Sequence, residues 1–267
     1  MNSLVRNYHM HIFITGASSG IGEAIARHFG AESSNKLTLV ARRLEKMEAL
    51  GSELSTQTQA LKFDLTQPSA ASQALVQAQE HFGPVDVLIN NAGANHLGDP
   101  AGFDVSAAER LFALNVFSPM RLIEAALPEM RKRGQGAIVN VASIAAANAP
   151  GIMTHYAATK AALARYSEGL ATQLEPEGIQ VLTVYPGPVK TPMEDQVRDQ
   201  LGGDLGMGDR LPNGKPEELA IKIDEALNKR KRRLVYPGFY ASALWFPLVG
   251  QRLTDEFSPR LETSSST

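Results

Sequence analysis

The sequence HIFITGASSGIG, residues 11–22, decides the fold. His11–Thr15 is a short β-branched and aromatic run, and a helical pattern after the glycines continues through Phe29. The order is therefore strand, glycine-rich turn, helix. Glycines at 16, 20 and 22 permit a tight turn and close backbone approach, and a helix N-terminus offers free amides to a pyrophosphate. Such a turn can also be purely structural; with the features below it predicts a dinucleotide site.

A second apolar strand is predicted at Lys36–Ala41, about twenty residues after the glycines. Dinucleotide folds place there an acid for a ribose 2′-hydroxyl or a base for a 2′-phosphate. Here the residues are Arg42 and Arg43. Two guanidiniums can fork onto a phosphate, so the sequence favours NADP(H) over NAD(H). Solvated surface arginines are the alternative.

The end of a third strand is predicted at Leu61–Leu65. A carboxylate at Asp64 can accept a hydrogen bond from an adenine amino group. Because Thr66 and Pro68 are expected to open the next helix, Asp64 as a helix cap is an equal alternative.

Two further strands are predicted to end in polar or small residues. Asp86–Asn90 is followed by Asn91-Ala92-Gly93, where a flat ring could lie against the backbone. Ala137–Val141 delivers Ser143 to the carboxyl edge of the sheet, where open α/β sheets bind ligands. A serine in an alanine-rich loop can also simply cap backbone.

Tyr156 and Lys160 are four residues apart on a helix predicted from Met153 to Leu174, so both side chains leave one face. A neighbouring ammonium favours phenolate, and such a pair is expected to exchange a proton near neutral pH. Ser143 precedes the tyrosine by thirteen residues. Alone, the pair could lie on an exposed helix face. Its occurrence together with Ser143 and the dinucleotide motifs favours catalysis.

The sixth strand is predicted at Ile179–Tyr185. The turn Pro186–Thr191 leaves it and is expected to touch the nicotinamide end of a cofactor, through Thr191 and the backbone of Val189. Residues 193–214 are interpreted as a mobile substrate lid, with an ordinary surface loop as the alternative.

The composition limits the class of protein. The 267 residues are 43% hydrophobic and 20% charged, which predicts one domain over residues 10–260 with flexible termini at 1–9 and 261–267. A net charge of −2 gives no general attraction to nucleic acid. Without cysteine, disulfides and thiolate catalysis are excluded. Because we find neither a signal peptide nor a spanning segment, we expect a cytoplasmic protein.

Two long helices are predicted at Ala107–Arg133 and at 153–174, each with an apolar stripe suited to an oligomer interface. Asn115 lies in the first, where buried polar packing is its simplest explanation. The uncharged, aromatic stretch 234–250 follows a basic run that begins at Lys229. It is expected to form a pocket wall or an oligomer contact; shallow membrane association through 229–250 is the less favoured alternative.

These motifs together resemble the short-chain dehydrogenase/reductase family over about residues 10 to 235. The matching pieces are Thr15–Gly22, Asn90–Gly93, Asn115, Ser143, Tyr156-x-x-x-Lys160, Pro186-Gly187 and Thr191. The resemblance implies an α/β, doubly wound (Rossmann-type) seven-stranded parallel sheet with helices on both faces. It also implies hydride transfer between a nicotinamide and a carbonyl or secondary alcohol, in a homodimer or homotetramer.

The resemblance also implies roles. Tyr156 would be the general acid or base, Ser143 would bind the substrate oxygen, and both would contact substrate. Lys160 would bind nicotinamide ribose and lower the tyrosine pKa, and Asn115 would hold a relay water. No metal is expected. The predicted cofactor contacts are Gly16, Ser18, Ser19, Gly20, Ile21, Gly22, Arg42, Arg43, Asp64, Leu65, Asn91, Ala92, Gly93, Tyr156, Lys160, Pro186, Gly187, Val189 and Thr191.

The aromatic stretch 234–250 points to an apolar substrate. Two rival functions are a catalytically silent NADP(H)-sensing protein and a nucleotide-sugar epimerase or dehydratase. The first could dispense with Ser143, Tyr156 or Lys160, yet this chain has all three. The spacing of the glycines and the length of the chain disfavour the second.

Overall fold

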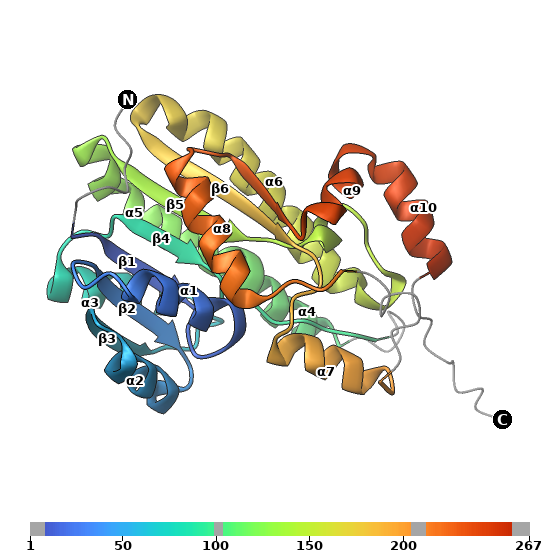
Figure 1. Ribbon diagram of the computed structural model, residues 1–267, viewed down its shortest axis with the longest axis horizontal. Helices are drawn as coiled ribbons and strands as arrows, with labels where there is room; N and C mark the ends of the chain where they lie inside the picture. The colour runs from blue at the N-terminus through green and yellow to red at the C-terminus, as the bar shows by residue number, and fades with distance from the viewer. Residues whose placement is uncertain (1–8, 99–103, 204–211, 258–267) are drawn as a thin grey trace.

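Seven parallel strands form the centre of the molecule, in the order β3-β2-β1-β4-β5-β6-β7 (Figure 1). The computed structural model describes residues 9–98, 104–203 and 212–257. The strands are β1 (His11–Thr15), β2 (Lys36–Ala41), β3 (Gln57–Lys62), β4 (Val87–Asn90), β5 (Gly136–Val141), β6 (Ile179–Pro186) and β7 (Arg233–Tyr236). The predicted seven-stranded doubly wound sheet is confirmed.

Helices cover both faces of the sheet because its strands are apolar on both sides. In β1, Ile12 and Ile14 pack in one buried cluster with α1 (Gly20–Gly30), α2 (Leu44–Glu53) and α8 (Pro216–Asn228). The intervening Phe13 packs in a second cluster with α3 (Ala70–Phe82), α5 (Ser118–Arg133) and α6 (Thr154–Leu174). Figure 1 shows α1 and α8 in front of the sheet.

The third strand and the helix after it differ from the prediction. The strand β3 ends at Lys62, so Phe63, Asp64 and Leu65 lie beyond it. The helix α3 begins at Ala70 and not at Thr66. The intervening residues form turns, one of them closed by a hydrogen bond from the Gln67 amide to the Asp64 carbonyl.

The predicted helix 107–133 is interrupted. The helix α4 (Val105–Phe112) leads into a π-helical turn, Ala113–Phe117, before α5 begins. Such turns widen the helix by one residue and recur at functional sites. This one carries Asn115, whose buried amide bonds to backbone outside the helix.

The topology brings the predicted site to one edge of the sheet. The strand order reverses between β1 and β4, and ligands of doubly wound sheets bind beside that switch point. Gly16, Asn91, Ser143 and Gly187 follow the carboxyl ends of β1, β4, β5 and β6. Beyond this edge lie α7 (Pro192–Gln200), α9 (Ala241–Trp245) and α10 (Pro247–Phe257), on the right of Figure 1.

Several predictions concern the periphery. Residues 204–211 of the predicted lid, and the termini 1–8 and 258–267, lie outside the described residues. Among the described helices, none has the length and apolar character to cross a bilayer.

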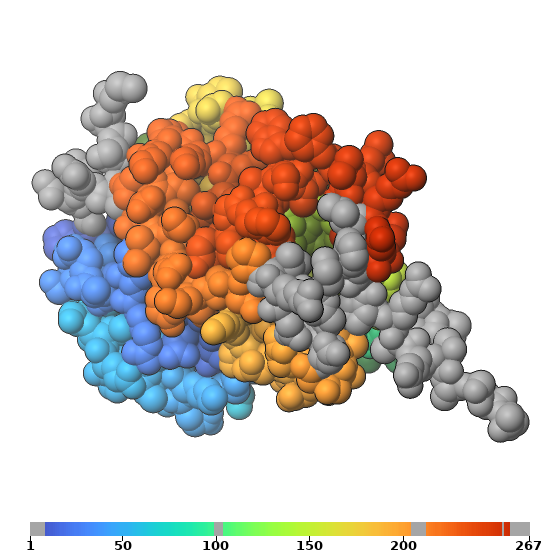
Figure 2. Space-filling view, turned by 45° about the vertical axis from the view of Figure 1, so that its right-hand side comes forward, coloured from blue at the N-terminus to red at the C-terminus, as the bar shows by residue number. Residues whose placement is uncertain are grey.

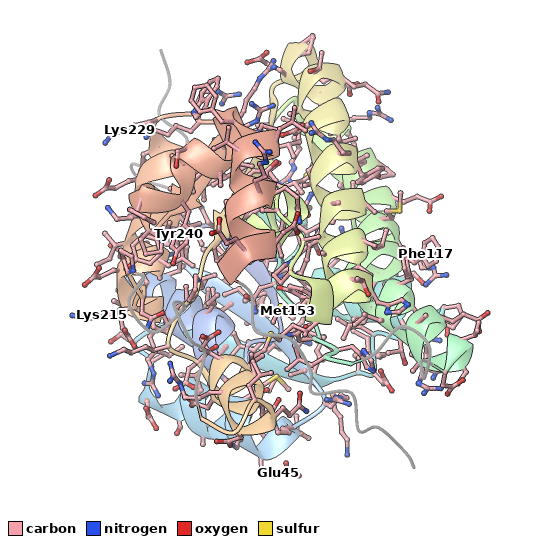
Figure 3. All side chains as sticks on the ribbon, turned by 90° about the vertical axis from the view of Figure 1, so that its right-hand side faces the viewer. Glu45, Phe117, Met153, Lys215, Lys229 and Tyr240 are labelled. Carbon is pink, nitrogen blue, oxygen red and sulfur yellow. The ribbon has the colours of Figure 1, made fainter. Side chains whose placement is uncertain are left out.

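Figure 3 shows Phe117, 47% exposed, pointing away from the body of the protein. The oligomer interface on α5 and α6 and the cytoplasmic location stay predictions.

Candidate active site

A cavity of about 960 Å³ opens at the carboxyl edge of the sheet. It extends from the glycine turn before α1 to the C-terminal helices, and Figure 2 shows a hollow beside the red C-terminal segment. Of the predicted site residues, its wall contains Gly16, Ser18, Ser19, Gly20, Ile21, Arg42, Arg43, Asp64, Leu65, Asn91, Ala92, Gly93, Ser143, Tyr156, Lys160, Pro186, Gly187, Val189 and Thr191. Gly22 and Asn115 lie behind the wall.

The glycine turn forms a close-fitting backbone cradle. Gly16 and Gly20 have φ of +67° and +59°, a region that glycine adopts without a side-chain clash. A Cβ on Gly22 would lie 2.3 Å from the Gly16 carbonyl oxygen, so only glycine lets the helix start this close. Within the described chain no side chain caps the N-terminus of α1. Its free amides and positive dipole therefore fit the pyrophosphate of a dinucleotide.

Hydrogen bonds fix this cradle to the neighbouring strand. The Thr15 hydroxyl accepts from the amides of Asn91 (3.0 Å) and Ala92 (2.9 Å). The Asn91 side chain donates to the Thr15 carbonyl at 3.0 Å. The two loops that follow β1 and β4 are thus one rigid unit.

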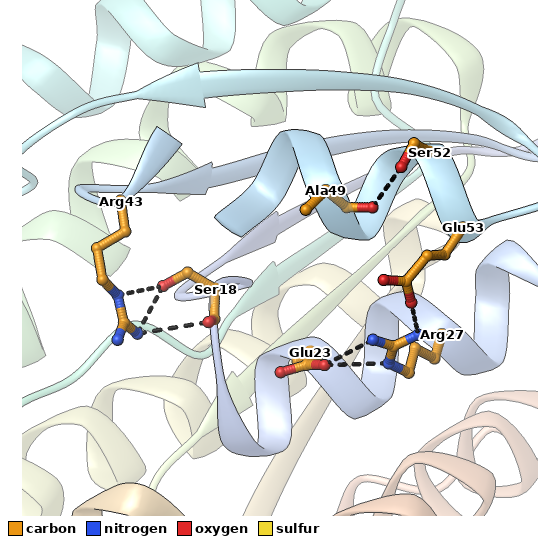
Figure 4. Close-up of polar contacts among 7 residues, drawn as sticks. All are labelled: Ser18, Glu23, Arg27, Arg43, Ala49, Ser52 and Glu53. Carbon is orange, nitrogen blue, oxygen red and sulfur yellow. Dashed lines mark hydrogen bonds and ion pairs between the residues drawn. The ribbon is translucent and has the colours of Figure 1, made fainter. Parts of the chain in front are cut away.

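Arg43 is tied to the glycine turn (Figure 4). Its guanidinium donates to the hydroxyls of Ser18, at 2.8 and 3.2 Å, and Ser19, at 2.7 Å. Arg42 is exposed at the same end of the cavity. The pair offers two cations beside the turn, the chemistry that a 2′-phosphate requires.

Asp64 lies in the wall as predicted, but it is not a helix cap. Its carboxylate accepts from the amide of Thr66 at 3.0 Å and from the hydroxyl of Thr66 at 2.8 Å, which closes a local turn. The residue before α3 is Ser69. The helix-cap alternative is therefore wrong.

Ser143, Tyr156 and Lys160 converge in the cavity. The Ser143 hydroxyl lies close enough to the Tyr156 phenol to lower the pKa of that phenol, and it accepts a hydrogen bond from the Ala145 amide at 3.1 Å. The Lys160 ammonium, 4% exposed, donates to the Val141 carbonyl at 2.9 Å. It lies 5.8 Å from the centroid of the Tyr156 ring.

The proton affinities differ from the prediction that the ammonium makes Tyr156 ionise easily. Burial is the largest effect and raises the pKa of the Tyr156 phenol. The neighbouring Ser143 hydroxyl lowers this pKa and the Glu194 carboxylate raises it, and the net change is a rise. Burial also lowers the pKa of Lys160 to about 8. The low-dielectric surroundings disfavour both charged forms. In this structure the phenol is therefore a proton donor.

Asn115 supports the site from behind Gly93. Its carbonyl oxygen accepts from the Ala94 amide at 3.0 Å, and its amide donates to the Ala94 carbonyl at 3.0 Å. The amide also donates to the Thr159 hydroxyl at 3.0 Å, and this hydroxyl donates to the Tyr156 carbonyl at 2.7 Å. A Cβ on Gly93 would lie 3.3 Å from both Asn115 Oδ1 and Lys160 Nζ. The π-helical turn is thus joined to the helix that carries Tyr156.

The turn after β6 holds the remaining predicted contacts. The Thr191 hydroxyl accepts from the Glu194 amide at 3.3 Å and so caps α7. A Cβ on Gly20 would touch the Thr191 methyl at 3.1 Å, which places this turn against the glycine turn. Val189 is buried and pairs with Gly214 through a β-bridge.

Part of the wall was not named among the predicted site residues. These lining side chains include those of Asn95, Asn148, Pro150 and, from α10, Thr254. Val197 and Val249 lie in the segments 193–214 and 234–250, which were predicted to border the substrate. The uncharged stretch 234–250 was the available signal, but nothing marked α10 as a helix against the cavity. Among the described residues no three His, Asp or Glu side chains group as metal ligands do.

Comparisons with known proteins agree with this geometry. The sequence profile described as short chain dehydrogenase matches residues 10–202. Dehydrogenase/reductase SDR family member 7B of Bos taurus is 32% identical over 277 residues, which cover 96% of this chain and 84% of that protein.

Two solved structures are similar. A short-chain dehydrogenase from Sphingobium yanoikuyae in complex with NADPH has a TM-score of 0.77 at 30% identity, covering 96% of this chain and 99% of that one. L-sorbose reductase from Gluconobacter frateurii, complexed with NADPH and L-sorbose, has a TM-score of 0.76 at 28% identity, covering 86% and 96%. The protein belongs to the short-chain dehydrogenase/reductase family, whose members interconvert carbonyls and alcohols with NAD(P).

Proposed function

We propose that this protein is an NADP(H)-dependent reductase that converts a ketone to a secondary alcohol, with Tyr156 as general acid. The observation that carries the proposal is that Ser143, Tyr156 and Lys160 line one cavity together with the glycine turn. A carbonyl oxygen beside these two hydroxyls would receive two hydrogen bonds.

Each residue then has a distinct role. Bound NADPH would supply the hydride to the carbonyl carbon. Tyr156 donates its proton to the carbonyl oxygen, and Ser143 stabilises the charge that develops on that oxygen. Lys160 keeps a cation close to the phenol, which stabilises the phenolate left after proton transfer. Asn115 holds the π-helical turn and Thr159 in register with Tyr156.

The cofactor that Arg42 and Arg43 favour supports reduction as the physiological direction, because NADPH is the cell's usual hydride donor for reductions. Tyr156, protonated at neutral pH, would act as the acid in that direction.

Arg43 and Arg42 support NADP(H) as the cofactor. The guanidinium of Arg43, oriented by Ser18 and Ser19, would meet a 2′-phosphate, and Arg42 would add a second cation. Both solved structures described above hold NADPH, in agreement with this assignment. Asp64, in the same wall, would accept a hydrogen bond from the adenine amino group.

The test is turnover of a ketone panel by the purified protein with NADPH and, separately, NADH, followed by loss of reduced-nicotinamide absorbance. We expect reduction of at least one ketone and a higher kcat/KM for NADPH. Tight NADPH binding with no turnover of any ketone would favour the silent binding protein.

A further inference from the structure

The far side of the cavity is formed by a segment outside the family profile. The profile match ends at residue 202, whereas residues 239–254, here called the C-terminal segment, contribute to the wall. The lining residues from this segment are Phe239, Tyr240, Ser242, Ala243, Phe246, Val249, Gly250 and Thr254. The wall opposite the predicted nucleotide end thus lies outside the part of the chain that the profile matches.

The start of the C-terminal segment is fixed to the end of β6. The Tyr240 ring packs on Gly187, where a Cβ would lie 2.6 Å from the ring. The Tyr240 hydroxyl donates to the Pro212 carbonyl at 3.2 Å. Figure 3 labels Tyr240 and Met153, both towards the middle of the molecule in that view.

The end of the C-terminal segment is fixed to the loop that follows Ser143. The Ala149 amide donates to Gln251 Oε1 at 2.9 Å, and Gln251 Nε2 donates to the Ala149 carbonyl at 3.0 Å. Asn148 Nδ2 donates to the Pro247 carbonyl at 2.9 Å. These bonds hold α10 against the same loop that carries the catalytic serine, so the wall has a defined distance from the reacting carbonyl.

The chemistry of this wall is mostly apolar. Besides the C-terminal segment, the cavity is lined by apolar side chains from α7, its C-cap residue and the loop before α6, namely Met193, Val197, Leu201, Ile144, Ile152 and Met153. The polar side chains at this end are Asn148, Ser242 and Thr254. Of the charged side chains in the described wall, Arg42, Arg43 and Asp64 lie at the nucleotide end; Lys160 and Glu194 lie near Tyr156. A substrate group beyond the carbonyl therefore meets mainly hydrocarbon, and among the described wall residues at this end no cation faces a carboxylate on it.

Phe246 and Val249 line the cavity yet are 65% and 60% exposed. Their neighbours Trp245 and Leu248, 75% and 86% exposed, are not part of the described cavity wall. An apolar group bound in the cavity would cover Phe246 and Val249 and leave the other two outside. Burial of apolar surface drives such binding.

We propose that the C-terminal segment is the specificity wall of this reductase and selects ketones that carry a large, uncharged apolar group. Phe246 and Val249 contact that group, and the Gln251 and Asn148 hydrogen bonds set its distance from Ser143. The inference rests on the proposed function, because it assigns the substrate of the same site.

The experiment measures kcat/KM with NADPH for 2-butanone, 2-hexanone, 2-decanone and 9-oxodecanoate. Each buried methylene adds binding energy, so we expect kcat/KM to rise at least about tenfold from 2-butanone to 2-decanone. 9-Oxodecanoate has the chain of 2-decanone with a terminal carboxylate, and we expect at least about a tenfold lower kcat/KM for it.

Two adjacent aromatic residues provide matched variants. Phe246→Ala should lower kcat/KM for 2-decanone about tenfold and leave that for 2-butanone within about twofold. Trp245→Ala should change neither by more than about twofold. Melting temperature and NADPH affinity, measured for both variants, report folding and the nucleotide end.

Equal kcat/KM along the series in the wild-type protein, or equal losses in the two variants, would overturn the specificity wall while leaving the reductase intact. Binding of NADPH without turnover of any ketone would overturn the proposed function, and the inference with it.

Discussion

The two ends of the cavity are built in opposite ways. At the nucleotide end the wall is largely backbone, with Gly16 and Gly20 at positive φ. Behind it, Gly22 leaves no room for a Cβ and Thr15 is bonded to the loop after β4. At the substrate end the wall is side chain, from α7 and the C-terminal segment, and much of its apolar surface is exposed.

This difference reflects what each end recognises. A pyrophosphate is met by amides and a helix dipole, and the backbone reaches it only through glycines at fixed spacing. An apolar group is met by any hydrocarbon of suitable shape, which imposes no spacing. One end therefore has a motif, and the other has only a composition.

The largest effect is expected at Tyr156, which lies between the two ends of the cavity. Tyr156→Phe removes the acid and keeps the ring, so both ends should still bind their ligands. We expect kcat to fall about a thousandfold, within the usual range for lost general acid catalysis. NADPH affinity, measured by fluorescence titration, should stay within about threefold. A rate near that of the wild type would show that another group donates the proton.

Burial of Lys160 between the two ends of the cavity should lower the free energy of unfolding at neutral pH. Its pKa of about 8 in the folded protein lies below the ordinary 10.5. Between these values the unfolded chain binds the proton and the folded chain does not, so the free energy of unfolding should rise with pH across this window. The rise from this one group is at most about 3 kcal/mol.

The measurement is chemical denaturation of the wild type and Lys160→Met at pH 7.5, 9 and 10.5. The difference in unfolding free energy between the two proteins isolates the lysine, because other groups titrate in both. We expect the free energy of unfolding of Lys160→Met to exceed that of the wild type most at pH 7.5, and this difference to shrink as the pH rises. A difference independent of pH would contradict the lowered pKa.

The sequence was sufficient to predict the glycine turn and the strands, because their residues are constrained individually. Gly16 and Gly20 are needed for a positive φ, and Gly22 is needed because there is no room for a Cβ. The strands follow from continuous apolar runs. The π-helical turn at Asn115 was not predicted; the hydrogen bonds of Asn115 to Ala94 are tertiary contacts that no local pattern reveals.

Two other differences depend on the folded environment. The direction of the Tyr156 pKa shift is set mainly by burial, which spacing along a helix does not reveal. The contact of Gln251 with Ala149 joins residues 102 positions apart and follows no local pattern. Candidate chemistry was visible in the sequence, whereas its environment came from the fold.

Arg43 and Arg42 are the charged side chains of a nucleotide end that is otherwise mostly backbone. We expect Arg43→Ala to weaken NADPH binding about 10- to 100-fold by removing a charge-assisted contact to the 2′-phosphate. Arg42→Ala is the matched variant, with a loss of about tenfold or less. NADH, which lacks the phosphate, serves as the control ligand, and its dissociation constant should barely change. Equal weakening for both cofactors would mean that the arginines support the turn rather than read the phosphate.

The smallest expected effect concerns Thr159, which joins Asn115 to the helix of Tyr156. Thr159→Val keeps the shape and removes the hydroxyl that accepts from Asn115 and donates to the Tyr156 carbonyl. Loss of one buried hydrogen-bond partner costs about 1–3 kcal/mol of stability, and a displaced phenol should lower kcat about three- to tenfold with KM nearly unchanged. Thr159→Ser restores the hydroxyl and should recover kcat. If Thr159→Val destabilised the protein without changing kcat, the link from Asn115 would serve the fold alone, and the position of Tyr156 would depend on its contact with Ser143.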